Sequence, residues 1–262
     1  MPNMSFPDVR NDNHFKDRLT AGSDVVGAFI MVGGPEVVEI CGAVNLDFVI
    51  LDTEHTAAGW EKLSSMCLSA LYAGVFPLIR LGSTSRDLVT RALDIGARGV
   101  MFAQVQTADK ALEAARACRY PPLGTRGAVS GRNIGWGITI GLADYIDSAN
   151  RGVVCAVQVE TNESVGNVEA TAAVPGIDCL FVGLSDLSVD LGVPGQVRHP
   201  DVEAALDKVI AAARGRGVPV GIPLADTTLA ADYRRRGVSF FATTDRGVLA
   251  SGMTAYLKGF TS

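Results

Sequence analysis

Three ionisable side chains, Asp52, Glu54 and His55, follow directly after the apolar run 48–51. The run predicts a buried strand, and polar groups at the carboxyl ends of parallel strands form the active sites of α/β proteins. His55 is one of three histidines in the chain. Its pKa range suits a general base that Asp52 or another carboxylate would orient, and a structural role is the alternative.

Two further carboxylates, Glu160 and Asp186, follow the predicted strands 153–159 and 179–183. If these strands are neighbours, the carboxylates lie close together and cannot both stay ionised cheaply unless a cation lies between them. Oxygen ligands with room for water and substrate suit Mg²⁺ or Mn²⁺ better than a closed zinc site. The alternative is that each carboxylate caps the N-terminus of a helix.

Arg80 lies near the end of the apolar run 76–81, where an unpaired charge would be costly. Its anionic partner is either a substrate carboxylate or enolate oxygen, held bidentately, or a structural salt bridge. Gln104, Gln158 and Ser185 also lie at predicted strand ends.

The positions of the five lysines limit the possible reaction mechanisms. All five fall in predicted helices or tails, and none lies at a strand end. A Schiff-base mechanism needs a lysine at the site, so this pattern argues against one. No Gly-x-Ser-x-Gly motif occurs, which argues against acyl-enzyme chemistry.

Short apolar runs alternate with amphipathic stretches along the chain, and this alternation predicts eight βα repeats. The expected strands are 25–31, 48–51, 76–81, 99–104, 153–159, 179–183, 218–223 and 239–243. Eight repeats without a linker favour an α/β fold of the (β/α)8 TIM barrel type, with residues 1–14 as a tail and 15–262 as one domain. An open doubly wound sheet is the alternative, but the chain has no glycine-rich nucleotide-binding motif.

Helices are expected near 15–19 and over 87–95, 108–118 and 201–214. Asp94 ends one of them and is expected, from its own surroundings, to be an ordinary solvated helix residue. The connection 119–151 is unusually long and is expected to be a lid or another substrate-facing segment.

Composition limits the classes of partner. The net charge of −5 and the absence of a basic tract argue against nucleic-acid binding. No run reaches the roughly 20 apolar residues of a membrane span, and no signal region precedes the first helix. The five cysteines lie in apolar stretches without C-x-x-C spacing, which predicts buried free thiols and a cytoplasmic location.

An ordered set of motifs resembles the HpcH/HpaI family of class II, metal-dependent pyruvate aldolases. The set comprises Asp52-Thr53-Glu54-His55, Pro77-Leu78-Ile79-Arg80, Arg119-Tyr120-Pro121-Pro122, Gly124-Thr125-Arg126-Gly127, Gln158-Val159-Glu160-Thr161 and Gly183-Leu184-Ser185-Asp186-Leu187-Ser188. The resemblance implies a modified TIM barrel that forms a homo-hexamer, with its last helix exchanged between subunits.

The resemblance also implies roles for individual residues. Glu160 and Asp186 would bind a divalent cation, Mg²⁺ or Mn²⁺ with Co²⁺ possible, and Arg80 would bind pyruvate and steady its enolate. His55 would be the base. Asp52 and Asp94 would support that base. Gln158 would contact pyruvate, and the backbone near Ser185 would bind the pyruvate carboxylate.

The chain departs from the family pattern at positions expected to shape the aldehyde side of the site. Leu184 replaces a usual proline, Phe29 a frequent tryptophan, and both 130–136 and the segment around Leu224 are altered. The expected function is cleavage of a 4-hydroxy-2-oxo acid to pyruvate and an aldehyde, and the reverse addition. The alternatives are oxaloacetate decarboxylation, bond formation to an unusual acceptor, or a non-catalytic binding barrel.

Overall fold

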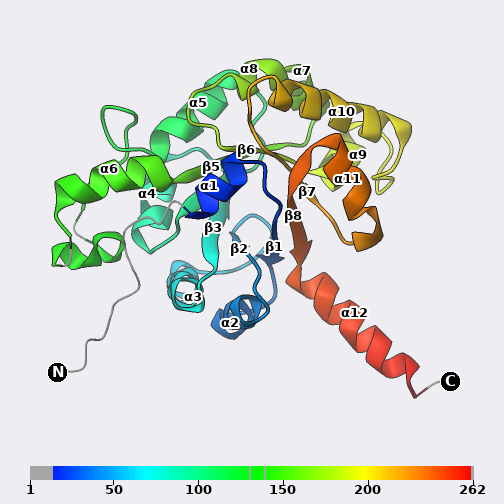
Figure 1. Ribbon diagram of the computed structural model, residues 1–262, viewed down its shortest axis with the longest axis horizontal. Coiled ribbons are helices and arrows are strands. Elements are labelled where there is room, and N and C mark those ends of the chain that lie inside the picture. The colour runs from blue at the N-terminus through cyan, green and yellow to red at the C-terminus, as the bar shows by residue number, and fades with distance from the viewer. Residues whose placement is uncertain (1–13, 130, 139, 261–262) are drawn as a thin grey trace.

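The computed structural model describes residues 14–129, 131–138 and 140–260. Its strands are all parallel and close into a barrel in chain order, from β1 beside β2 round to β8 beside β1 (Figure 1). The predicted (β/α)8 barrel is therefore confirmed. The strands are β1 (Val25–Ile30), β2 (Phe48–Asp52), β3 (Phe76–Leu81), β4 (Gly99–Phe102), β5 (Val154–Val159), β6 (Cys179–Val182), β7 (Val220–Pro223) and β8 (Val238–Thr244).

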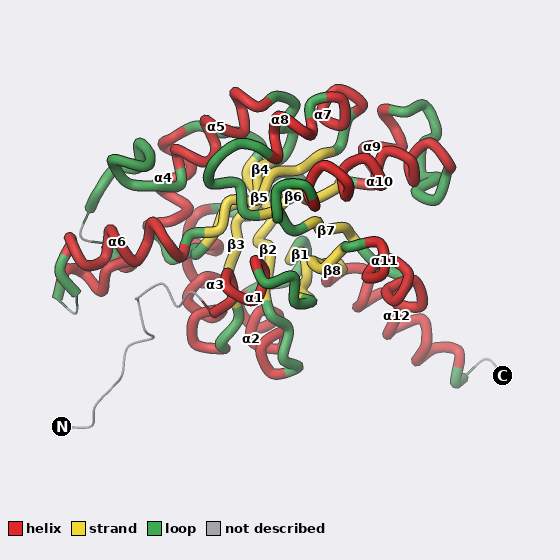
Figure 2. Tube along the Cα trace, turned by 45° about the horizontal axis from the view of Figure 1, so that its top comes forward, coloured by secondary structure: helices red, strands yellow, loops and turns green. Residues whose placement is uncertain are grey.

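Helices surround the barrel on the outside, as Figure 2 shows. The α-helices are α1 (His14–Thr20), α2 (Pro35–Ala43), α3 (Trp60–Ala73), α4 (Arg86–Asp94), α5 (Ala108–Ala117), α6 (Leu142–Gly152), α7 (Asn162–Gly166), α8 (Val168–Ala172), α9 (Leu184–Asp190), α10 (Pro200–Arg214), α11 (Ala230–Arg236) and α12 (Asp245–Lys258). Two 3₁₀ helices complete the set, η1 (Arg132–Gly137) and η2 (Thr227–Leu229). Of the expected tail, only His14 falls within the described residues, and it begins α1.

Two sequence predictions differ from the structure. The strand expected over 99–104 ends at Phe102, because Gln104 takes a left-handed conformation with φ 56°. The connection 119–151 contains η1 and α6, and η1 packs beside α3 and α4 on the outside of the barrel. A lid or substrate-facing role for this connection stays a prediction.

Large aromatic side chains fill the barrel interior. Phe48 and Phe240 stack with ring centroids 4.1 Å apart, and Phe15 of α1 stacks on Phe76 at 4.2 Å. Helix α1 therefore closes the amino end of the barrel. The polar groups of an active site are expected at the carboxyl end. Gly221 of β7 is required by this packing, since a Cβ there would lie 2.7 Å from a ring carbon of Phe181.

A second apolar layer joins the outer faces of the strands to the helices. The five cysteines are buried and free, as predicted, and each packs as a small apolar side chain. None of the helices that the structure describes combines the length and apolar character needed to cross a bilayer.

Helix α12 behaves differently from the other helices. It projects away from the barrel (Figure 1), and none of its residues is buried. Its exposed side chains include a stripe at helical spacing, Leu249, Met253, Tyr256 and Leu257, that Phe260 extends. A stripe of this kind normally packs against another surface.

Candidate active site

The guanidinium of Arg80 is held rigidly at the carboxyl end of the barrel. Its Nε and Nη2 donate to the two carboxylate oxygens of Asp52 at 2.8 and 2.7 Å, and its Nη1 lies 3.3 Å from Glu54 Oε2. The ring of Phe29 packs against it with the guanidinium carbon 4.9 Å from the ring centroid. The predicted structural partner of Arg80 thus exists, and it fixes the orientation of the charge.

Asp52 is a fully buried partner of this arginine. Burial alone would raise the pKa of Asp52, but the hydrogen bonds and charge of Arg80 outweigh burial and hold it below its ordinary value. The carboxylate also accepts from the backbone N–H of Glu54. Asp52 therefore orients Arg80 directly, and its contact with His55 is made to the backbone of that residue.

His55 lies on the rim, with 53% of its side chain exposed. Its Nε2 is 3.9 Å from Glu54 Oε2, so the carboxylate nearest to this imidazole is Glu54. Glu54 consequently lies between Arg80 and His55. It lies in the bend that follows β2, two residues after Asp52.

Glu160 is 2% exposed and accepts hydrogen bonds at both of its oxygens. The backbone N–H of Gln104 donates to Oε1 at 2.7 Å, and Gln158 Nε2 donates to Oε2 at 2.9 Å. The left-handed turn at Gln104 therefore aims a backbone donor at Glu160. Gly183 leaves room for the carboxylate, since a Cβ there would lie 2.7 Å from Glu160 Oε2.

The electrostatics of Glu160 favour a cation beside it. Burial raises its pKa to about 7, and the charges of Glu54 and Asp186 add to the rise while Gln104 and Arg80 oppose it. Asp186 is exposed in the first turn of α9 and approaches closely enough to act on Glu160. The structure thus brings together the two carboxylates that the sequence singled out.

These residues fit a divalent cation of the Mg²⁺ type. In the described residues no group of three or more histidine, cysteine, aspartate or glutamate side chains could hold a metal ion. Mg²⁺ is commonly held by only one or two carboxylates, with water and substrate completing its shell. Gln158 Oε1 is buried without a donor, which fits a site that holds water or a substrate hydroxyl.

The other predicted substrate contacts lie at the same end of the barrel. Ser185 is exposed in the first turn of α9, and Leu184 before it is buried in the apolar layer outside the strands. Leu224 follows β7, packs against the same layer, and donates its backbone N–H to Ala242. Only Ser185 of the three presents an exposed side chain.

Asp94 lies apart from these residues. It ends α4, and helices of a parallel barrel run opposite to the strands, so this end is remote from the mouth. Its Oδ1 accepts from Arg126 Nη2 at 3.0 Å and Asn133 Nδ2 at 3.2 Å, and burial raises its pKa although Arg126 lowers it. No described contact joins Asp94 to His55 within one chain.

Known proteins are similar to this chain in both sequence and fold. The family model described as HpcH/HpaI aldolase/citrate lyase matches residues 26–250, which is most of the chain. The chain belongs to the HpcH/HpaI aldolase/citrate lyase family. It is an aldolase-family enzyme, a carbon–carbon lyase, and the membership points to a divalent metal cation as its cofactor.

Named members of the family align over nearly their whole length. Pyruvate aldolase of Rhizobium etli is 34% identical over 95% of this chain and 97% of its own. The 4-hydroxy-2-oxovalerate aldolase of Rhodococcus jostii is 32% identical over 95% and 96%. Among solved structures, an HpcH/HpaI aldolase/citrate lyase family protein of Burkholderia cenocepacia superposes with a TM-score of 0.90 at 35% identity, covering 95% of this chain and all of the other.

Proposed function

We propose that this enzyme cleaves a 4-hydroxy-2-oxo acid to pyruvate and an aldehyde, and catalyses the reverse aldol addition. The observation that carries the proposal is a fixed guanidinium, Arg80, at the same strand ends as the buried Glu160 and the exposed His55. Similarity to aldolases that are named for pyruvate and 4-hydroxy-2-oxovalerate supports this choice of substrate class.

Arg80 stabilises the negative charge that develops on pyruvate oxygen when the carbon–carbon bond breaks. Asp52, Glu54 and Phe29 hold the guanidinium in place, so little reorganisation is needed as the enolate forms. Free backbone N–H groups in the first turn of α9, near Ser185, bind the pyruvate carboxylate. Gln158 lies beside Glu160 and contacts the pyruvate unit.

Glu160 and Asp186 would hold Mg²⁺, Mn²⁺ or Co²⁺, and the cation would supply Lewis-acid polarisation of the 2-oxo group. His55 removes the proton of the 4-hydroxyl during cleavage and returns it during addition. Glu54 Oε2, 3.9 Å from Nε2, is placed to orient this imidazole. Leu224, which is only partly buried, flanks the aldehyde side, whereas the buried Leu184 would act on it only indirectly.

The test is deuterium exchange into the methyl group of pyruvate, measured by NMR after quenching and chelation. Exchange that requires Mg²⁺, Mn²⁺ or Co²⁺ is the expected result, because reversible enolate formation replaces methyl protons with solvent deuterons. Cleavage of a panel of 4-hydroxy-2-oxo acids is measured in parallel. Absence of both exchange and cleavage with every metal would overturn the proposal, whereas turnover of oxaloacetate alone would reassign the enzyme as a decarboxylase.

We also propose that the protein is a hexamer in which α12 packs on a neighbouring barrel. The support is the exposed apolar stripe on a helix that leaves its own barrel. In such an assembly, Asp94 of one subunit would support the His55 of a neighbouring subunit.

Light scattering is expected to give a mass about six times 27.4 kDa. Leu249→Asp places a charge in the stripe and is expected to lower the mass, whereas Ser251→Asp, on the opposite face of α12, is expected to preserve it. A mass of one chain at micromolar concentration would contradict the assembly.

A further inference from the structure

Asp245, the first residue of α12, binds the loop that follows β1. Its Oδ1 accepts from the backbone N–H of Met31 at 3.0 Å, and its Oδ2 accepts from those of Val32 at 3.1 Å and Gly33 at 2.7 Å. One carboxylate thus satisfies three consecutive backbone donors, and hydrogen bonds to an ionised acceptor are the strong ones. The path of the chain from β1 to α2 therefore depends on this side chain.

This loop lies at the carboxyl end of the barrel, beside the candidate active site. Strand β1 pairs with β2 on one side and with β8 on the other, so the loop leaves β1 between Asp52 and Asp245. Met31 packs against the apolar interior of the barrel. Phe29, two residues earlier, packs against the guanidinium of Arg80. The loop therefore forms one wall of the mouth.

A cavity of about 180 Å³ lies against the same loop. Met31 and Gly33 line it together with Asp52, which orients the arginine of the candidate site. The other described lining residues are apolar except Thr56 and Lys62. Sites for whole organic ligands start at roughly 300 Å³, so this smaller space suits a short carbon chain that extends from a substrate bound next to it.

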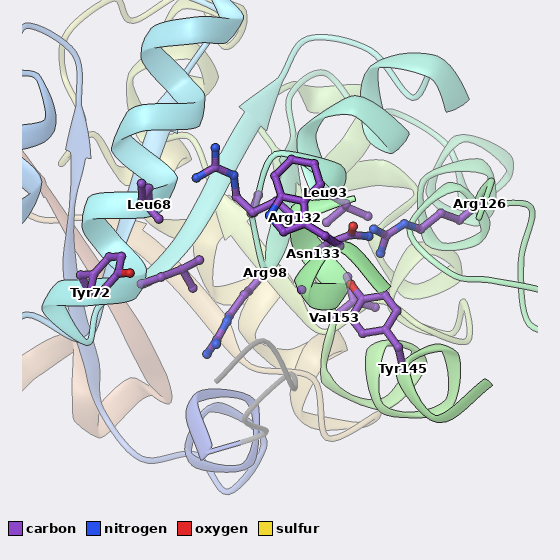
Figure 3. Close-up of a pocket in the computed structure, with 14 residues that line it drawn as sticks. Leu68, Tyr72, Leu93, Arg98, Arg126, Arg132, Asn133, Tyr145 and Val153 are labelled. Atoms are coloured by element: carbon purple, nitrogen blue, oxygen red, sulfur yellow. The ribbon is translucent and has the colours of Figure 1, made fainter. Parts of the chain in front are cut away.

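Another cavity, of about 270 Å³, lies outside the barrel between α3, the end of α4 and η1 (Figure 3). Arg98 and Val153 line it, and these residues precede β4 and β5. It is therefore near the amino ends of the strands, whereas Arg80 lies near a carboxyl end. The cavity against the β1 loop, in contrast, adjoins the candidate active site of its own chain.

We propose, on the basis of the proposed aldolase reaction, that Asp245 is a positioning residue for the aldehyde. It holds the β1 loop so that Met31 and Gly33 form the wall against which the carbon chain of the aldehyde packs. Because Asp245 begins α12, the helix that leaves the barrel is fastened at its base to this wall.

Pyruvate does not depend on the loop in the same way. Asp52 and Glu54 hold Arg80 from the β2 side. Phe29 lies within β1, where pairing with both neighbouring strands holds it. A change at Asp245 should therefore weaken the binding of the aldehyde and leave the formation of the pyruvate enolate intact.

The test is Asp245→Asn, measured in the addition of propanal to pyruvate at saturating pyruvate and Mn²⁺. The amide has only one acceptor oxygen, and its amino group faces backbone donors that the carboxylate accepted. We expect KM for propanal to rise about tenfold, because hydrogen bonds to a charged acceptor are lost. We expect kcat to change less than KM, and deuterium exchange into the pyruvate methyl group to stay near the native rate.

Asp47→Asn is the matched control. Asp47 is also half-buried and accepts a backbone N–H of β1, that of Val26 at 2.8 Å, but at the amino end of the barrel. This variant should lose stability and keep the native KM for propanal. Gly33→Ala moves the loop without touching Asp245, since a Cβ there would lie 2.7 Å from the side chain of Val37. It should raise the same KM, and it decides the matter if Asp245→Asn does not fold.

The comparison of the two reactions separates the outcomes. A native KM for propanal in the folded Asp245→Asn protein would overturn this inference and leave the proposed function intact. Equal losses of propanal addition and of pyruvate exchange, or a lower mass by light scattering in this variant alone, would also overturn it, because stability or assembly would then be the cause. A native enzyme that shows neither exchange nor addition with any metal would overturn both proposals.

Discussion

Replacing Arg80 with lysine is expected to lower kcat/KM for cleavage by about 10³-fold. The ammonium keeps the charge but cannot form the two parallel hydrogen bonds to Asp52 that fix the guanidinium. Loss of one preorganised donor at a developing oxyanion costs about 3–4 kcal/mol of transition-state stabilisation. Steady-state kinetics with a 4-hydroxy-2-oxo acid, together with the exchange of pyruvate methyl protons, measures the effect.

Arg119 provides the matched control for this substitution. It is a buried arginine paired with Asp178 at 3.0 Å, and its side chain is 8% exposed against 7% for Arg80. Arg119→Lys is expected to destabilise the fold to a similar degree while kcat/KM stays near that of the native enzyme. If both variants lose activity in proportion to their stability, Arg80 is structural and its proposed role fails.

The barrel could be predicted from the sequence because both faces of each strand are buried. Each strand is therefore a continuous apolar run in the sequence. The run 76–81, for example, is buried at every position in β3. Helix α6 was missed because Leu142–Gly152 is largely polar and follows a glycine-rich stretch. Its helical state depends on contacts such as the edge packing of Tyr145 on Tyr120, which local sequence does not reveal.

The site was predictable only as a set of residue types at strand ends. That Asp52 holds Arg80, and that Glu54 is the acid nearest His55, depends on side-chain directions across β2 and β3. The backbone donor at Gln104 could not be foreseen either, because it requires the left-handed turn after β4. The roles of Gln158, Ser185, Leu184, Leu224 and Asp94 stay predictions.

Glu160→Gln is expected to stabilise the metal-free protein at pH 8 by up to about 3 kcal/mol. Folding raises the pKa of Glu160 from 4.5 to about 7, chiefly through burial. Between these values the folded state holds a proton that the unfolded state has lost, so the native protein loses stability as pH rises through the window. Glutamine cannot ionise, so the variant escapes this loss, and the difference should vanish near pH 4.5.

Urea unfolding in the presence of a chelator, repeated across this pH range, measures the difference. Glu163→Gln, an exposed carboxylate on α7, is the control and is expected to follow the native protein. Saturating Mg²⁺ or Mn²⁺ should reverse the order, because a ligand that binds only the folded state adds stability that the Glu160→Gln variant cannot gain. The same carboxylate thus destabilises the empty barrel and stabilises the metal-loaded one. Identical pH profiles for the native and Glu160→Gln proteins would show that Glu160 is not held in this strained state.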